Sequence, residues 1–185
     1  MPEWMEYPVV TVGVGEEKWH EPLTFLCQLR MEEVAPYDPQ GLLPHVGMLW
    51  FFAALDYYLG DLDAEVYPGL GLWTPEMTRV LYSNSCEGLR THKVVNSDGS
   101  PAELPAERVA FAPCGRREEG LKLLGEAYVD EVEETLPGCV SLLQVEEEER
   151  WGLQFHDCGV LNFVIGRKAL ADGRWEEVRG HLFSY

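Results

Sequence analysis

The sequence predicts a strand-dominated α+β fold in which two similar strand–short helix–strand units, a pseudo-duplication, pack into one compact unit. Short runs of apolar, β-branched and aromatic residues recur along the 185 residues, and each run has the length of a strand. The stretches between the runs carry Gly, Pro and acidic residues, which favour turns. Three short sequence blocks also occur twice in the same order. We therefore expect a single domain over residues 1–185.

The N-terminal half is expected to hold four strands and one short helix. The strands are recognised as apolar runs bounded by turn residues. Pro36 limits the helix to two turns, because proline cannot donate the hydrogen bond that a longer helix would need. In chain order, the expected elements are strands at 9–15 and 22–29, the helix at 30–37, and strands at 47–55 and 78–83.

The C-terminal half follows an irregular middle region, residues 85–139. We expect this region to hold a polar linker at 96–107, a short strand at 108–113, and helix-forming residues at 117–136 that two glycines weaken. Downstream, the expected elements are strands at 140–145, 151–155 and 159–165, a short helix at 166–173 that closes with glycine, and a final strand at 179–185.

The repeated blocks define two halves. TFLCQL, from Thr24, resembles VSLLQV, from Val140, and GMLWF, from Gly47, resembles GVLNF, from Gly159. A tryptophan also precedes VLYS in the first half and HLFS in the second. Neither half is long enough to bury its own apolar face well. The halves, at about 22–84 and 140–185, are therefore expected to pack together.

The same blocks resemble the YwqG-like family, a bacterial family of unknown function. PLTFLCQLRMEEVAPYDPQGLLPHVGMLWFFAALD resembles its first signature, in which an apolar strand and a short helix precede a glycine and an aromatic strand. KLLGEAYVDE and VSLLQV are similar to two later segments of the family. FHDCGVLNFVIGRKALADGRWEEVRGHLFSY is similar to its closing segment. The resemblance covers about residues 22–185.

The resemblance implies a strand-dominated, pseudo-duplicated fold and no known reaction. Gln28 and Gln144 match paired strand glutamines of the family. The family's WGD motif reads FHD here, so only Asp157 and Gly159 correspond to that segment. The glycine-rich opening that precedes the first strand in the family is largely missing from this sequence.

The chain carries 32 acidic and 14 basic side chains, which gives a formal net charge of -18. This charge argues against nucleic-acid binding, which relies on Lys and Arg to neutralise phosphates, and against binding to an anionic membrane surface. It favours a basic protein partner through electrostatic steering, although acidity can also serve solubility alone. The sequence does not indicate an oligomeric state.

The N-terminus and the cysteines favour a cytoplasmic protein. The opening MPEWMEYPVV lacks the basic and apolar regions of a secretory signal, and no run approaches the ~20 apolar residues of a membrane span. The five cysteines are widely spaced, with no CxxC pair and no Cys/His spacing typical of zinc sites. We expect free thiols in a reducing compartment, with no metal and no cofactor.

Five polar side chains are candidates for ligand binding: Gln28, His45, Gln144, His156 and Asp157. A glutamine buried in an apolar strand should be hydrogen-bonded, either to its counterpart between the halves or to the backbone of a neighbouring loop. His45 and Asp157 fall at equivalent turns of the two halves and could face one cleft. Asp157 also has a structural alternative, since a short acidic side chain can fix a turn by accepting hydrogen bonds from nearby backbone N–H groups.

The neighbours His156, Asp157 and Cys158 do not predict a catalytic set. On a regular strand His156 and Cys158 would be ~6.6 Å apart, whereas a Cys–His couple needs ~3 Å. The sequence also lacks a phosphate-loop ending and a GxSxG elbow.

The leading hypothesis from the sequence is a non-enzymatic interaction protein whose acidic surface engages a basic partner, as an immunity or antitoxin-type protein would. The alternative is a small-ligand-binding protein or an enzyme that uses a polar cleft between the halves. A structural accessory domain without a small ligand is a third possibility.

Overall fold

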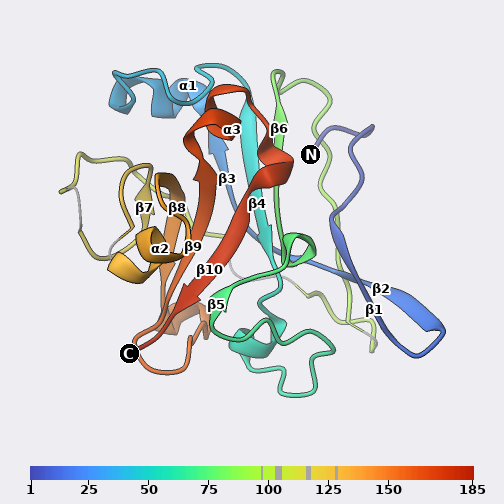
Figure 1. Ribbon diagram of the computed structural model, residues 1–185. Helices are drawn as coiled ribbons and strands as arrows, with labels where there is room; N and C mark the ends of the chain where they lie inside the picture. Colours follow the sequence, from blue (N-terminus) through green and yellow to red (C-terminus); the bar gives the residue numbers. More distant parts are fainter. Residues whose placement is uncertain (97, 103–105, 116–117, 128) are drawn as a thin grey trace.

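The computed structural model describes residues 1–96, 98–102, 106–115, 118–127 and 129–185. It contains 34% strand and 17% helix, so the predicted strand-dominated α+β class is confirmed. The strands form two antiparallel sheets and a separate two-stranded ribbon (Figure 1).

The first sheet has three strands and the second has five. In spatial order the first consists of β3 (Thr24–Arg30), β4 (Met48–Ala53) and β6 (Thr78–Ser83). The second consists of β5 (Gly71–Leu72), β10 (Arg179–Phe183), β9 (Val160–Gly166), β8 (Cys139–Glu146) and β7 (Lys122–Leu123). The ribbon pairs β1 (Val9–Val14) with β2 (Glu17–Pro22) and extends away from the body, at the right in Figure 1. Because β5 lies within the first half of the sequence, the second sheet draws strands from both halves.

The helices of the described residues are all short. The α-helices are α1 (Met31–Val34), α2 (Asp130–Thr135) and α3 (Arg167–Ala171). The 3₁₀-helices are η1 (Ala35–Tyr37), η2 (Asp56–Leu59), η3 (Pro75–Met77), η4 (Glu149–Trp151) and η5 (Trp175–Glu177). A 3₁₀-helix precedes the last strand of each half: η3 precedes β6, and η5 precedes β10.

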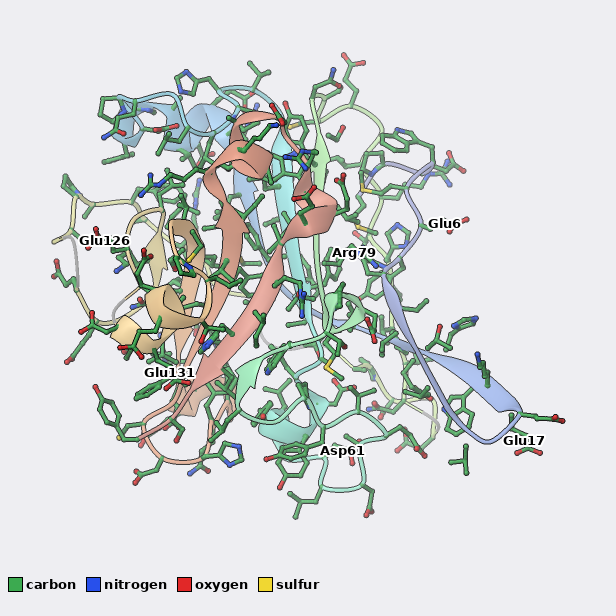
Figure 2. All side chains as sticks on the ribbon, viewed as in Figure 1. Glu6, Glu17, Asp61, Arg79, Glu126 and Glu131 are labelled. Atoms are coloured by element: carbon green, nitrogen blue, oxygen red, sulfur yellow. The ribbon has the colours of Figure 1, made fainter. Side chains whose placement is uncertain are left out.

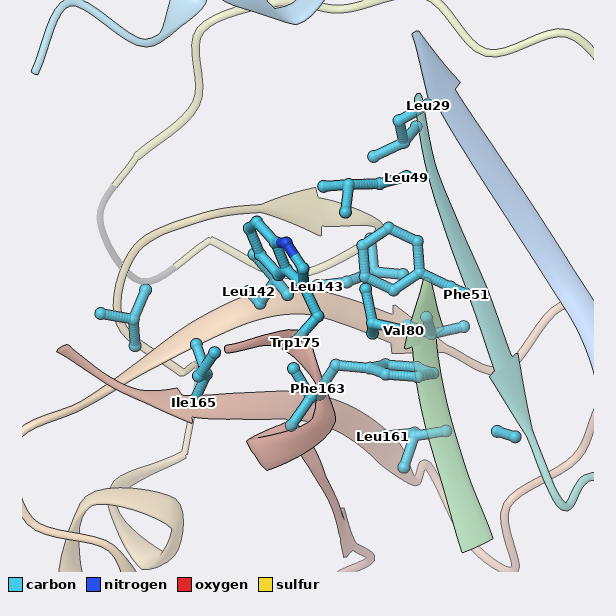
Figure 3. Close-up of a cluster of buried hydrophobic side chains, with 14 of the residues drawn as sticks. Leu29, Leu49, Phe51, Val80, Leu142, Leu143, Leu161, Phe163, Ile165 and Trp175 are labelled. Carbon is cyan, nitrogen blue, oxygen red and sulfur yellow. The ribbon is translucent and has the colours of Figure 1, made fainter. Parts of the chain in front are cut away.

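One hydrophobic core joins the two sheets. β4 contributes Phe51 and β9 contributes Phe163, both fully buried, and their rings meet edge to face with centroids 5.4 Å apart. Figure 3 shows this cluster between the sheets. Since successive side chains on a strand point to opposite faces, the neighbours Trp50 and Asn162 lie on the outer faces.

Further segments cover those outer faces. On the three-stranded sheet, Trp50 packs in a second apolar cluster with Met1 and Val10 of the N-terminal segment. On the five-stranded sheet, Val164 packs against Val132 of α2. We call residues 118–127 and 129–136 the α2 cover.

The two sheets share one pairing pattern. In the β3–β4 pair the register shifts just after Phe25, and in the β8–β9 pair it shifts just after Ser141. These positions are equivalent when TFLCQL is placed on VSLLQV. The strand partners correspond as well, with Gln28 opposite Trp50 and Gln144 opposite Asn162. This common register is consistent with a pseudo-duplication, which stays a prediction.

Most of the predicted elements are confirmed. The strands expected at 9–15, 22–29, 47–55, 78–83, 140–145, 159–165 and 179–185 correspond to β1, β3, β4, β6, β8, β9 and β10, with ends that differ by at most two residues. The helix expected at 30–37 is α1 followed by η1, and the helix expected at 166–173 is α3. Gly173, with φ +67°, follows α3, as expected of a helix that closes with glycine.

Two predicted strands are wrong. Residues 108–113 form no strand: they are mostly exposed, and Phe111 packs its ring on Tyr37 in place of a strand partner. Trp151 ends the 3₁₀-helix η4, and residues 152–155 continue as a loop that starts with Gly152 in the left-handed region. Their apolar pattern arises because Leu153 and Phe155 are buried from a loop.

The middle region and the N-terminal ribbon also depart from the predictions. Of the helix expected at 117–136, only α2 is helical among the described residues, and residues 117 and 128 lie outside them. Residues 97 and 103–105 of the predicted linker lie outside them too. The sequence pattern missed β2, since Glu17–Pro22 is polar and gains its strand conformation by pairing with β1.

Candidate functional site

Five carboxylates surround one hollow of about 120 Å³, which we call the acidic hollow. It lies between the base of the β1–β2 ribbon and the segment that follows β4. Its apolar floor includes Val10 and Leu23, and no Lys or Arg is among its described lining residues. The carboxylates belong to Glu21, Asp56, Asp61, Asp63 and Glu65.

Local turn chemistry holds this segment in place. Gly60, with φ +100°, ends η2 in the left-handed conformation that glycine adopts without strain. The Asp61 carboxylate accepts a hydrogen bond from the Asp63 N–H at 3.1 Å, and the Asp56 carboxylate accepts one from the Thr24 hydroxyl at 2.5 Å. Figure 2 shows Asp61 in the loop at the lower end of the molecule. The carboxylates are therefore presented to solvent on a defined loop.

The two candidate glutamines do not meet. Both lie on the outer faces of their sheets, on opposite sides of the shared core. Gln28 is exposed, and its amide oxygen accepts a hydrogen bond from the Trp50 indole N–H at 3.0 Å. Gln144 is fully buried, and its amide nitrogen donates to the carbonyl oxygens of Glu118 and Gly120. Gln144 therefore holds the α2 cover, in line with the structural alternative, and no polar pair of glutamines stands between the halves.

His45 and Asp157 lie at opposite ends of the sandwich, so the expectation that they face one cleft is corrected. His45 precedes β4, and its Nε2 is 3.8 Å from the Asp38 carboxylate. The FHDCG turn instead lies beside the segment that follows β4, where Gln154 N–H donates to the Tyr58 carbonyl at 2.9 Å. The two turns therefore lie near opposite ends of β4 and are separated by the length of that strand.

His156 and Asp157 lie together in a tight turn. His156 and Cys158 both adopt left-handed backbone conformations, with φ +62° and +49°. The Glu147 carboxylate closes this turn, since it accepts hydrogen bonds from the N–H groups of Phe155 (2.9 Å) and Gly159 (3.1 Å). The Asp157 backbone N–H donates to the Ser184 hydroxyl at 3.1 Å. The carboxylate that fixes the turn therefore comes from Glu147, where the sequence had suggested Asp157.

The side chains of this turn are not set up for nucleophilic catalysis. The neighbouring Asp157 carboxylate raises the pKa of the Cys158 thiol above its usual value, and desolvation and the Glu147 carboxylate add to the shift. A thiolate is therefore disfavoured. His156 instead joins an aromatic cluster: its Nε2 is 3.1 Å from the Tyr67 hydroxyl, and its ring meets Tyr58 edge-on at 5.6 Å.

A row of polar side chains crosses the outer face of the five-stranded sheet, and two of its three members, Asn162 and His181, are not among the candidates from the sequence. Gln144, Asn162 and His181 lie opposite one another on β8, β9 and β10, and all three are fully buried beneath the α2 cover. The Asn162 side-chain oxygen accepts from the Ser141 hydroxyl at 2.9 Å. The Asn162 side-chain nitrogen and His181 Nδ1 have no hydrogen-bond partner among the described residues.

A sequence signal for this row does exist. Asn162 interrupts the apolar run GVLNFVI and corresponds to Trp50 of the first half, and His181 interrupts the last strand. Each looks isolated in the sequence, because the pairing of β9 with β10 that makes them neighbours is a property of the fold. Burial lowers the pKa of His181 below its usual value of 6.5, so the ring is neutral near pH 7.

Three further findings bear on the expected chemistry. Among the described residues, no group of three or more His, Cys, Asp or Glu side chains is arranged to hold a metal ion. The five cysteines are free thiols, as predicted. No helix in the described part of the chain has the length and apolar character needed to cross a membrane.

Comparison with curated proteins gives no match. A family model does match the chain: it describes a domain of unknown function, DUF1963, and matches residues 1–109. The match includes the ribbon, the whole three-stranded sheet, strand β5 and every residue that lines the acidic hollow. Since it spans more than half of the 185 residues, the chain belongs to the DUF1963 family.

Proposed function

We propose that this protein is a non-enzymatic, cytoplasmic binding protein whose acidic surface engages a basic protein partner, as an immunity or antitoxin-type protein does. The acidic hollow is the observation that carries the proposal. Its five carboxylates come from β2 and from the loop after β4, and they converge without a Lys or Arg among the described lining residues to balance them. A Lys or Arg side chain of a partner would supply the missing charge.

The net charge of the whole molecule also favours a basic partner. A formal net charge of -18 steers a basic partner toward the surface over distances comparable to the Debye length, which is about 8 Å at physiological ionic strength. The apolar floor of the hollow provides contact for the methylene stem of a lysine or arginine.

The alternative function, an enzyme or ligand-binding protein with a polar cleft between the halves, has less support. Gln28 and Gln144 lie on opposite outer faces, and His45 and Asp157 lie at opposite ends. In the FHDCG turn, the raised pKa of Cys158 disfavours the thiolate form that a nucleophile would need. We further propose, from the strand blocks that recur in order, that the chain is of the YwqG-like type and pseudo-duplicated.

Affinity capture of the partner tests this function. The tagged protein is used to capture proteins from its native cells at low and at high salt, and the captured partner is then titrated against two double variants. D63N/E65Q removes two charges from the hollow, while E16Q/E17Q removes two from the tip of the ribbon. We expect a basic partner that is lost at high salt and that binds D63N/E65Q roughly 5- to 30-fold more weakly, at about 0.5–1 kcal/mol per exposed charge.

The control decides whether the hollow is the site. E16Q/E17Q has the same net charge as D63N/E65Q and should bind nearly as well as the unchanged protein. Equal weakening by both variants would mean that only the overall charge matters. A partner that is acidic, or whose capture does not respond to salt, would contradict the proposal.

A further inference from the structure

A groove of about 510 Å³ lies at the opposite end of the sandwich from the acidic hollow. One wall comes from the loop that precedes β4, with Leu42, Leu43 and Pro44, and the other from α3 and its following turn, with Leu170 and Trp175. It is the cleft between the halves, but none of the five candidate polar residues lines it. Its volume lies within the range of roughly 300–1,000 Å³ that small-molecule sites have.

The walls of this groove are apolar and fixed by the fold. Leu43, Val140 and Leu170 are at most 5% exposed and belong to the shared core. Tyr82 contributes its ring, which lies 6.0 Å from that of Trp175, while its hydroxyl is occupied by a hydrogen bond to the Val46 carbonyl at 3.0 Å. The groove therefore offers preformed apolar and aromatic contact area.

The charge of the groove is opposite to that of the molecule. Among the described lining residues Arg167 is the one that carries a charge, and none is acidic, in a chain with 32 acidic side chains. The neighbouring carboxylate of Asp172 is engaged by Arg174 at 3.2 Å. Within the described residues, neither the Arg167 guanidinium nor the Trp175 indole N–H makes a hydrogen bond or an ion pair. Two donors are thus available at an apolar groove.

We propose that this groove binds a small amphiphilic carboxylate, a molecule with an aliphatic body and a terminal carboxylate group. The body lies along Leu42, Leu170 and Trp175, and the carboxylate accepts hydrogen bonds from Arg167, whose planar fork matches its two oxygens. A cationic or neutral amphiphile would leave the guanidinium without a counter-charge. The site is independent of the proposed basic partner, since it shares no lining residue with the acidic hollow.

Binding of decanoate to the full chain tests this site, with decanol and decylamine as ligands of equal chain length and different charge. Calorimetry gives the affinity, and the indole N–H signals in a ¹H–¹⁵N spectrum give the location. We expect saturable binding of decanoate that shifts the Trp175 signal, which a Trp175→Phe variant identifies. The Trp50 signal should stay in place, because its N–H is bonded to Gln28 on a different face.

Variants then distinguish the contribution of the Arg167 charge to binding from that of the apolar walls. Arg167→Gln should weaken decanoate binding at least tenfold, and Leu42→Gln should weaken it through the exposed wall. Arg167→Lys should restore only part of the binding, because an ammonium group keeps the positive charge but lacks the planar fork. Lys168→Gln removes the adjacent cation of α3, which does not line the groove, and should bind decanoate like the unchanged protein.

Several results would overturn the proposal. These are an absence of saturable decanoate binding, equal affinity for decanol, or an Arg167→Gln variant that binds as the unchanged protein does. A dimer in sedimentation that Leu42→Gln dissociates would instead assign the groove to a second copy of the chain. Unfolding midpoints of the variants check that each loss of binding occurs in a folded protein.

Discussion

His181 is a fully buried histidine, and only one of its two ring nitrogens has a hydrogen-bond partner among the described residues. Its Nε2 is 3.4 Å from the Thr135 hydroxyl of α2, and its Nδ1 has no hydrogen-bond partner in the described part of the chain. Burial lowers the pKa of the ring, although the nearby Glu131 carboxylate acts in the opposite direction. The folded protein therefore keeps His181 neutral at pH values where the unfolded chain already binds a proton.

This imbalance predicts a pH dependence of stability. Above the unfolded pKa of about 6.5 both states are neutral at this residue, and the full stability is present. As the pH falls below 6.5, the unfolded chain gains a proton that the folded protein resists, so the free energy of unfolding decreases, by up to about 1.4 kcal/mol per pH unit. Urea unfolding between pH 7.5 and 5 should show a smaller decrease for His181→Asn than for the unchanged protein. Identical pH profiles for the two proteins would contradict this assignment.

At the scale of single residues, the sequence predicts the kind of interaction that a side chain makes better than it predicts which residues that side chain contacts. The buried role of Gln144 follows from an amide inside an apolar strand, and the structure shows the expected bonds to a loop. Asn162 and His181 are visible in the sequence as polar interruptions of apolar strands, but that they form one row depends on which strands pair. The role of Glu147 in closing the FHDCG turn was missed for the same reason, since it comes from eight residues before Phe155.

At the scale of elements, two glycines stand where the second strand of each half begins. Gly47 has φ +88°, and a Cβ there would lie 2.0 Å from the Ser83 carbonyl oxygen. At Gly159 a Cβ would lie 2.2 Å from the Cβ of Phe155 and 2.3 Å from its carbonyl oxygen. Both strands thus begin in backbone crowding that only glycine tolerates.

Gly159→Ala should therefore destabilise the protein, by about 3 kcal/mol, since the new methyl group overlaps atoms of Phe155, whose backbone N–H is bonded to the Glu147 carboxylate. Gly166, at the other end of the same strand, is the matched control. It has a negative φ, and a Cβ there would have no heavy atom of the described residues within 4 Å beyond its chain neighbours. Gly166→Ala should thus change stability by less than about 1 kcal/mol. Urea unfolding of both variants measures the difference, and equal effects would contradict the crowding at Gly159.

Whether an apolar run becomes a strand depends on a partner as well as on its own pattern. The runs that became β4 and β9 are central strands with a neighbour on each side. Residues 151–155 and 108–113 have similar short apolar patterns, but within the described chain no strand pairs with them over their length. The polar segment of β2 shows the converse, because six paired residues of β1 hold it as a strand.

At the scale of the whole molecule, the boundary of the family match does not coincide with a boundary of the fold. The match ends at residue 109, yet β5 (Gly71–Leu72) pairs with β10. The Trp73 backbone N–H donates to the Gly180 carbonyl at 2.8 Å, and the Arg179 guanidinium donates to the Trp73 carbonyl. Phe51 meets Phe163 across the core. The matched residues therefore rely on the C-terminal sheet to bury their inner face.

This dependence predicts that residues 1–109 do not fold alone. Without residues 110–185, the inner face of the three-stranded sheet would expose Leu49, Phe51 and Val80 to water, and β5 would lose its partner β10. The full chain should unfold in one transition, with tryptophan fluorescence and far-UV circular dichroism changing together in urea. The 1–109 fragment should show no cooperative unfolding, poor dispersion of its amide signals and strong binding of an apolar dye. A fragment that unfolds cooperatively with a dispersed spectrum, or a full chain with two separate transitions, would show that the two sheets are independent units.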